Sequence, residues 1–134
     1  MISSFMLLAL FATVQTDGAA IRDHAPALSP DGRSIAYYSY RNGLPDIYVF
    51  DRQTGEIRQL TDTPELWEIE PFWSPDGTQL AFPAGISMRR LTFRMADIAT
   101  GTTHSVPFGL RVTGPASLSA DGQAFFFFER QDQF

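Results

Sequence analysis

The segment ALSPDGRSIAYYSY at residues 27–40 places the phrase Ser-Pro-Asp-Gly directly before a run of aliphatic and aromatic residues. The phrase begins at Ser29, returns at Ser74, and appears again at Ser119 with Ala in the place of Pro, so successive copies lie 45 residues apart. Its residue types suit a tight turn, because Pro presets φ, Asp accepts hydrogen bonds from nearby backbone amides and Gly adopts a positive φ. The aspartates of the three copies are therefore predicted to be turn residues, not catalytic or metal-binding residues.

The residues that follow each turn repeat as well. Apolar runs occupy residues 35–38, 80–83 and 125–128. In the first two copies a second run ends in Asp and leads into Thr-Gly, at residues 47–55 and 93–101. These two stretches are 46 residues apart, which indicates a one-residue insertion in copy two.

Each copy is predicted to form four short strands, which in the first copy fall near residues 26–29, 34–40, 46–51 and 56–61. No window shows the apolar spacing of an amphipathic helix, so we expect few helices. Four antiparallel strands every ~40–45 residues are typical of a propeller blade. The predicted fold is all-β: a partial β-propeller with two complete four-stranded antiparallel blades and half of a third.

Two stretches carry a family resemblance: SPDGRSIAYYSYRNGLPDIYVFDRQTGEIRQLTDTP from Ser29, and EPFWSPDGTQLAF from Glu70. They resemble the TolB-like β-propeller repeats, a family related to WD repeats, and the resemblance extends over residues 26–129. It implies an exported propeller that acts by binding proteins. The same repeats are similar to the propellers of prolyl-oligopeptidase-like enzymes and of tricorn protease. Copy two departs from the pattern at Arg94, which falls inside its third predicted strand.

Composition excludes several classes of function. The formal net charge is −5 with no Lys and no basic cluster, so nucleic acid is not an expected partner. There is no Cys, which rules out a disulfide framework and thiolate metal sites. We expect no cofactor and no metal site.

The N-terminal run FMLLALFATV, residues 5–14, is too short to span a bilayer, which needs roughly 20 apolar residues. With Gly18 and Ala20 as small residues before a cleavage point, residues 1–20 are predicted to be a signal peptide, although no Lys or Arg precedes the run. The propeller segment is then 21–134, and the protein is expected to be periplasmic or secreted. The alternative is a buried strand at residues 8–16.

No catalytic constellation is visible in the sequence. The nucleophile motif G-x-S-x-G of serine hydrolases is not complete, because residues 85–89 read GISMR and lack the final Gly. The two histidines are His24, expected just ahead of the inner strand of blade one, and His104, expected in the outer strand of blade two. The sequence therefore predicts that the chain is not an enzyme.

The remaining candidate is a binding surface on one rim of the propeller. There, the loop between the second and third strands of each blade lies beside the connection to the next blade. Trp and Arg dominate the energetics of many protein interfaces. The candidate partner-binding residues on this rim are Tyr40, Arg41, Asn42, Trp67, Glu68, Arg89 and Arg90. The alternative interpretation is structural, with Glu68 or Glu70 in salt bridges with Arg89 or Arg90 and Trp67 packed between blades.

Two and a half blades cannot close a ring, since propellers use ~4–8 blades. We expect one of three arrangements: a fragment of a longer reading frame, self-association of two chains that completes the propeller, or an open arc docked on a larger protein partner. The function expected is that of a non-catalytic protein-binding or scaffold module. The alternative is the propeller part of a prolyl-oligopeptidase-like serine peptidase whose hydrolase domain lies elsewhere.

Overall fold

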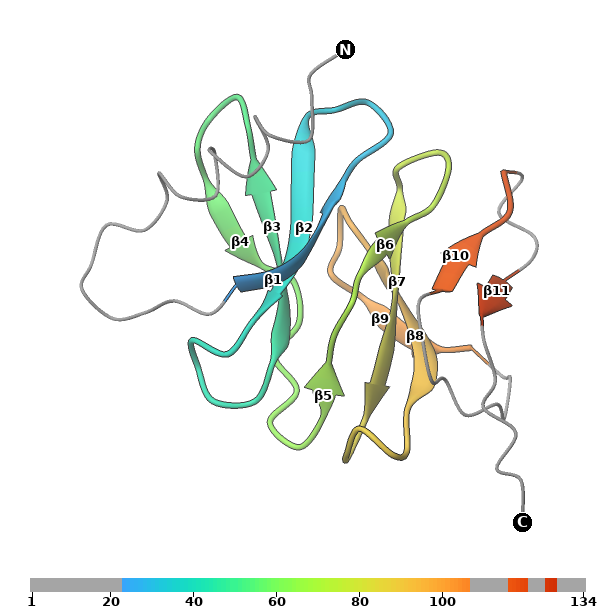
Figure 1. The fold of residues 1–134 in the computed structure, drawn as a ribbon. Helices are drawn as coiled ribbons and strands as arrows, with labels where there is room; N and C mark the ends of the chain where they lie inside the picture. The colour runs from blue at the N-terminus through green and yellow to red at the C-terminus, as the bar shows by residue number, and fades with distance from the viewer. Residues whose placement is uncertain (1–22, 107–115, 121–124, 128–134) are drawn as a thin grey trace.

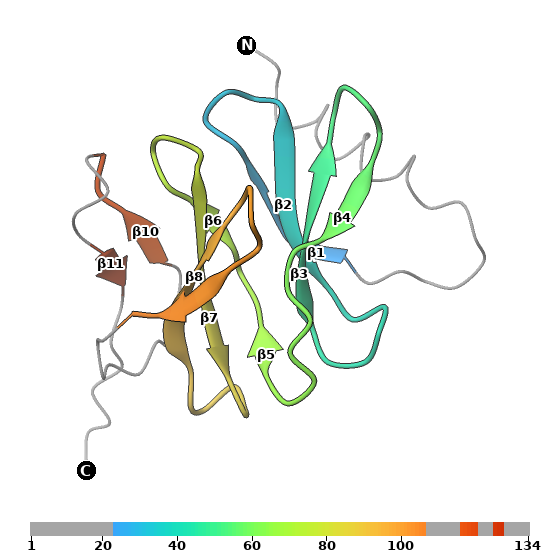
Figure 2. The ribbon, with the colours of Figure 1, turned by 180° about the vertical axis from the view of Figure 1, so that it is seen from behind.

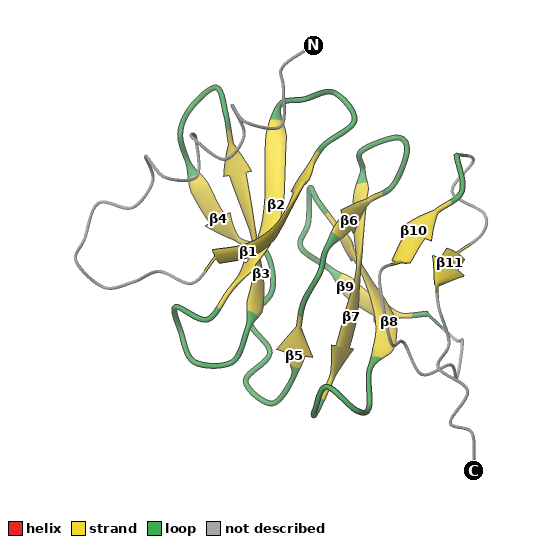
Figure 3. Cartoon of the chain, in the orientation of Figure 1, coloured by secondary structure: helices red, strands yellow, loops and turns green. Residues whose placement is uncertain are grey.

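The computed structural model describes residues 23–106, 116–120 and 125–127, and it folds them into three antiparallel β-sheets that fan side by side (Figure 1). Within these ranges the regular elements are all strands (Figure 3), and none of the described residues forms a helix long and apolar enough to cross a membrane. The predicted signal peptide, and the alternative strand at 8–16, lie outside the described residues.

The first sheet, blade one, contains β1 (Asp23–Leu28), β2 (Ser34–Ser39), β3 (Asp46–Asp51) and β4 (Ile57–Gln59). The strands are hydrogen-bonded in chain order, as a propeller blade requires. The four predicted strands are confirmed, but the inner strand begins earlier than expected. His24 therefore lies inside β1, paired with Tyr38, and not ahead of the strand.

Blade two contains β5 (Trp67–Glu68), β6 (Phe72–Trp73), β7 (Gln79–Gly85), β8 (Thr92–Asp97) and β9 (Thr103–Ser105). Both β5 and β6 pair with β7, so they form one interrupted inner strand. A third sheet pairs β10 (Ala116–Leu118) with β11 (Phe125–Phe127). The inner strands β1, β6 and β10 are neighbours (Figure 2), which is the arrangement of successive blades around an axis.

The interruption of the inner strand is itself a repeated feature. Ala25 in blade one and Glu70 in blade two both have a positive φ, of 49° and 48°. Each is followed by a proline, Pro26 or Pro71, which has no N–H to donate to the neighbouring strand. In blade one the register between β1 and β2 shifts at this point, which defines a β-bulge.

The Ser-Pro-Asp-Gly turn of copy one has the predicted structure. The Ser29 hydroxyl donates to Asp31 Oδ1 at 2.6 Å and accepts a hydrogen bond from the Ser34 amide at 2.9 Å. Gly32 closes the turn with φ 72°. These contacts span only six residues, which explains why the local sequence determines the hairpin between β1 and β2.

Copy two repeats this turn closely. Asp76 Oδ1 accepts hydrogen bonds from the Ser74 hydroxyl at 2.6 Å, and from the amide and hydroxyl of Thr78 at 3.0 and 2.8 Å. Gly77 again has φ 72°. Since every donor stabilises the ionised carboxylate, the hydrogen bonds from Ser74 and Thr78 lower the pKa of Asp76 from 3.8 to about 2.

We expect the Asp76→Asn variant to lose part of the acid sensitivity of folding. A lowered folded-state pKa means that Asp76 stabilises the natural chain above pH 3.8, and that this contribution is lost as the pH falls to about 2. Asn keeps an acceptor oxygen for the turn but does not titrate. Acid unfolding followed by tryptophan fluorescence should show a smaller loss of stability over this interval in the variant. Parallel curves for the two proteins would contradict this.

The main hydrophobic core lies between blades one and two. β2, β3 and the end of β4 contribute from one side, and β7 and β8 from the other. Phe82 and Leu80 are fully buried there against Ala36 and Ile47. The indole nitrogen of Trp73 also donates to the carbonyl of Ala27 at 2.9 Å, so the inner strands of the two blades are joined by a hydrogen bond. Burial of both sheet faces explains why these strands do not alternate between polar and apolar residues.

Candidate partner-binding surface

Three segments meet at one end of the blades (Figures 1 and 2): the β2–β3 loop, the connection from β4 to β5, and the β7–β8 loop. Antiparallel order places them together, since the chain returns to this end after every second strand. The Ser-Pro-Asp-Gly turns lie at the opposite end. All seven candidate residues belong to this end or border it, and we refer to residues 40–45, 61–68 and 86–90 as the rim.

Aromatic rings join the two blades at the rim. Tyr40 of blade one contacts Trp67 of blade two edge to face, with ring centroids 6.1 Å apart. Tyr40 also contacts Tyr38 and His24 at 5.8 Å each, and His24 stacks on Tyr38 at 5.2 Å. Trp67 therefore packs between blades, as the structural alternative predicted. His24 and Tyr38 extend this cluster onto β1 and β2, which the local sequence did not predict.

Arg41 is held within its own blade. Its guanidinium donates to both carboxylate oxygens of Asp23, at 2.9 and 3.1 Å, and to the Tyr37 hydroxyl at 3.1 Å. It lies 4.4 Å from the centroid of the Tyr48 ring, a cation–π contact. Burial acts to lower the pKa of Arg41, but the hydrogen bonds and charges of Asp23 and Tyr37 together outweigh it and leave the pKa raised. Arg41 thus fixes the β2–β3 loop.

Asn42 is exposed beside Arg41 and completes the support of this loop. Its side-chain amide donates to the Tyr48 hydroxyl and to Gln59 Oε1, both at 3.1 Å. Because Arg41 and Asn42 are tied to β1, β3 and β4, the loop presents Tyr40 in a defined orientation.

Glu68 lies inside the molecule and not on the surface of the rim. It is 0% exposed, and its Oε1 accepts a hydrogen bond from the Thr63 hydroxyl at 3.1 Å. The Thr63 amide in turn donates to Asp46 of β3 at 3.4 Å. Burial raises the pKa of Glu68, against the opposing hydrogen bonds and the nearby charge of Arg94. The neighbouring blade, which the local sequence does not show, is what buries this residue.

The structure shows how Arg94, the residue of copy two that departs from the repeat pattern, is accommodated in its strand. It stands on β8 opposite Phe82, on the side of blade two that packs against blade one. Its guanidinium donates to the Thr103 hydroxyl, and its charge acts on Glu68. In blade one the equivalent acid, Asp23, is 45 residues earlier and is neutralised from the loop by Arg41. In blade two no ion pair with Glu68 is formed among the described residues, and Arg94 acts on it through its nearby charge alone.

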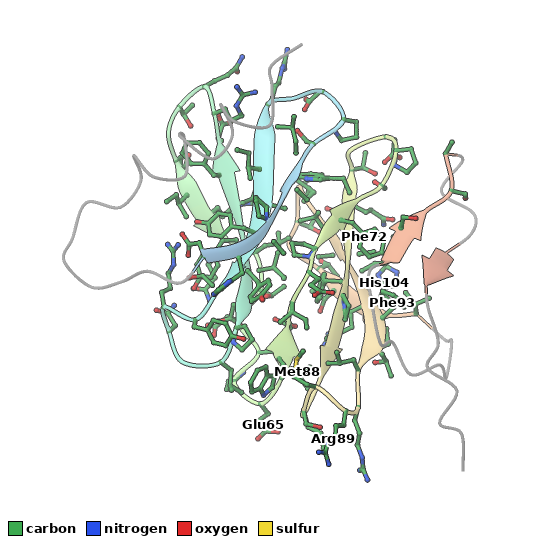
Figure 4. The ribbon with its side chains drawn as sticks, viewed as in Figure 1. Glu65, Phe72, Met88, Arg89, Phe93 and His104 are labelled. Atoms are coloured by element: carbon green, nitrogen blue, oxygen red, sulfur yellow. The ribbon has the colours of Figure 1, made fainter. Side chains whose placement is uncertain are left out.

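The β7–β8 loop is the most exposed part of the rim. Arg89 and Arg90 are both exposed, and within the described ranges neither forms the expected salt bridge with Glu68 or Glu70. Ile86 and Met88 on the same loop are 64% and 53% exposed. Figure 4 shows Arg89 extending away from the blade, at the same end as Glu65 and Met88. These two apolar residues were not among the candidates predicted from the sequence, although apolar side chains within a hairpin loop are a signal of an exposed contact surface.

The two histidines of the sequence lie on different blades. His24 stacks on Tyr38, whereas His104 is exposed on β9 at the far side of blade two. Among the residues that the structure describes, no three His, Asp or Glu side chains gather in a way that could hold a metal ion.

Fanned four-stranded antiparallel sheets with neighbouring inner strands define the class of the protein: it is a β-propeller protein. The TolB β-propeller domain matches residues 12–134, and the chain belongs to this family. The crystal structure of TolB from Acinetobacter baumannii is similar, with a TM-score of 0.66 and 26% identity over 87% of this chain and 29% of that chain.

Two curated proteins show related sequences. The uncharacterized peptidase YuxL of Bacillus subtilis strain 168 is 42% identical over 60 residues, which are 44% of this chain and 9% of YuxL. The Tol-Pal system protein TolB of Alcanivorax borkumensis is 41% identical over 58 residues, which are 42% of this chain and 13% of that protein. The chain thus spans a small part of the curated relatives that it matches.

Proposed function

We propose that this chain is a non-catalytic β-propeller module, exported to the periplasm or beyond the cell, that binds a protein partner through the rim. The observation that carries the proposal is the rim itself. It combines aromatic rings shared by two blades with an ordered loop that exposes apolar and cationic side chains. Similarity to a Tol-Pal system protein supports a role in a protein assembly. N-terminal sequencing of exported protein, expected to begin at Ile21, tests the location.

Structural order at the rim supports binding without catalysis. Aromatic and Arg side chains in fixed positions lose little conformational freedom when a partner docks, and such residues dominate interface energetics. Tyr40 and Trp67 are half-buried and fixed by each other. Asn42 and Met88 are exposed around them.

Site-specific photocrosslinking in the cells that make the protein tests this proposal. A photoreactive phenylalanine analogue replaces Met88 at the rim in one strain, and Gln53 in a second strain as the matched control. Gln53 is also exposed but lies on the β3–β4 turn at the opposite end. We expect one defined protein adduct from position 88 and none from position 53. An absence of adducts from 88, or the same adducts from both positions, would refute the proposal.

A second candidate is favoured by the 42% identity to the peptidase YuxL. On this hypothesis the blades belong to a propeller attached to a serine hydrolase domain, and the rim faces that domain. The genomic sequence beyond the codon for Phe134 separates the two candidates. Further Ser-Pro-Asp-Gly repeats up to a stop codon support the binding module, whereas a downstream G-x-S-x-G motif supports the peptidase.

A further inference from the structure

The β7–β8 loop exposes both apolar and cationic side chains. Ile86 and Met88 are two of the three large apolar side chains that stand exposed in the described ranges. The chain continues from them directly into Arg89 and Arg90. Two apolar side chains and two cationic side chains therefore lie within residues 86–90, although the chain as a whole carries a net charge of −5.

The backbone gives this loop a fixed shape. The Arg90 amide donates to the Ser87 carbonyl at 3.0 Å, which closes a turn over residues 87–90. Gly85 makes the closure possible, since a Cβ atom at this position would lie only 1.8 Å from the Arg90 carbonyl oxygen. A loop that is already ordered loses less entropy on binding than a flexible one.

The cations of this loop differ from the other arginines of the described ranges, of which Arg33 forms an ion pair with Asp31 at 3.9 Å. Arg41, Arg52, Arg58 and Arg94 each donate side-chain hydrogen bonds to neighbouring groups. In the same ranges Arg89 and Arg90 donate none. An exposed guanidinium with all its donors available binds carboxylates in a bidentate geometry.

We propose that the β7–β8 loop recognises an acidic segment of a protein partner, with carboxylates on Arg89 and Arg90 and an apolar side chain seated against Ile86 and Met88. This inference rests on the proposed function of the rim. The net charge of −5 repels extended polyanions and anionic lipid surfaces, but a short acidic segment meets chiefly the local positive charge of the loop. Met supplies a polarisable, adaptable contact for the apolar residue.

Glu65 adds a negative charge at the same end of the blades. It is exposed on the neighbouring connection, at the same end as Met88 and Arg89 (Figure 4). Carboxylates of the partner would be repelled by Glu65, so they must lie over the arginines. This arrangement discriminates against a segment that is acidic along its whole length.

A random-peptide display library panned against the immobilised chain tests the inference. We expect the selected peptides to be enriched in Asp and Glu next to a large apolar residue. In fluorescence polarisation, the double variant Arg89→Glu/Arg90→Glu should weaken their binding by about tenfold or more, since each tenfold corresponds to about 1.4 kcal/mol. Met88→Ala should weaken it severalfold, and Arg89→Lys/Arg90→Lys should weaken it less than the charge reversal does.

Arg33→Glu is the matched control. Arg33 is 68% exposed in the turn at the opposite end of blade one, so the same charge reversal there should change affinity by less than about twofold. Circular dichroism of all variants should retain the β-sheet spectrum, because the substituted side chains are exposed.

The outcomes separate this inference from the proposed function. Peptides that bind the double variant undiminished but are lost on Trp67→Phe or Asn42→Ala overturn the acidic-segment inference and leave the rim as the binding surface. Peptides that no rim variant affects, or no selection above background, refute both. Co-sedimentation with phosphatidylglycerol vesicles that depends on Arg89 and Arg90 would overturn the inference in favour of a lipid surface.

Discussion

The Phe82→Ala variant is expected to lose about 3–5 kcal/mol of stability, a large part of what a small domain has. Phe82 is 0% exposed and packs in the cluster that joins blades one and two, beside Ala36 and Leu80. Truncation removes the apolar contacts of the ring and leaves a cavity that the two sheets cannot fill, because each is held rigid by its own hydrogen bonds. Urea unfolding of the 134-residue chain, followed by tryptophan fluorescence, measures the loss.

Two further variants show whether the loss comes from the inter-blade core. Phe82→Leu keeps most of the volume and should cost less than about 1.5 kcal/mol. Ile86→Ala removes apolar atoms from a side chain that is 64% exposed, and it should change stability by no more than about 0.5 kcal/mol. A small effect of Phe82→Ala, similar to that of Ile86→Ala, would show that the two blades do not pack as described.

Replacing Glu68 by Lys is expected to be as damaging, at about 3–5 kcal/mol. The position is 0% exposed, so the new ammonium group would be buried close to Arg94 with no carboxylate between them. The Thr63 hydroxyl would also lose its acceptor. Glu68→Gln is the matched control, since it preserves the shape and an acceptor oxygen. If Lys were tolerated as well as Gln, Glu68 would have to be open to solvent.

Glu68 is also expected to make the free energy of unfolding depend on pH, with a defined sign. Burial raises the pKa of Glu68 above its usual value of 4.5, so the folded chain retains this proton to a higher pH than the unfolded chain. The contribution of Glu68 to stability is therefore greatest below pH 4.5 and decreases as the pH rises through the folded-state pKa. Asp46 has a pKa raised by burial as well and adds a change of the same sign.

Glu68→Gln removes the titration of Glu68 but not that of Asp46. The stability of the natural chain relative to the variant, measured as unfolding free energies, should therefore fall as the pH rises above 4.5. At neutral pH the variant should be at least as stable as the natural chain, because the dehydrated charge is gone. A natural chain that gains stability relative to the variant as the pH rises would contradict the assigned sign.

The predictions that succeeded concern features formed within a few residues or within one sheet. The Ser-Pro-Asp-Gly hairpins, the four strands of blade one and the one-residue insertion before β8 were all predicted. The inner strand was predicted less well. Its start at Asp23 and the bulges at Ala25 and Glu70 depend on pairing with strands that come later in the chain. No local sequence pattern shows where that strand pairing ends.

The candidate site was likewise predicted only in part: its location followed from the order of the strands, but the contacts of each residue did not. The sequence placed the rim loops at one end of the molecule, because the order of antiparallel strands determines which loops share an end. It did not distinguish the role of each residue within them. The Arg41 side chain fixes its own loop, whereas the side chains of Arg89 and Arg90 are exposed.

By itself, the sequence determined the repeat, the turns and therefore the blades, because six-residue hydrogen-bond patterns and runs of β-forming residues act locally. The tertiary structure decided which polar residues became buried. Glu68 is enclosed only because blade two packs against blade one, and the charge of Arg94 acts on it from β8, a different strand of its own blade. A charged side chain becomes buried when the neighbouring sheet packs over it. This packing involves both blades, so it is not determined by the sequence of a single repeat.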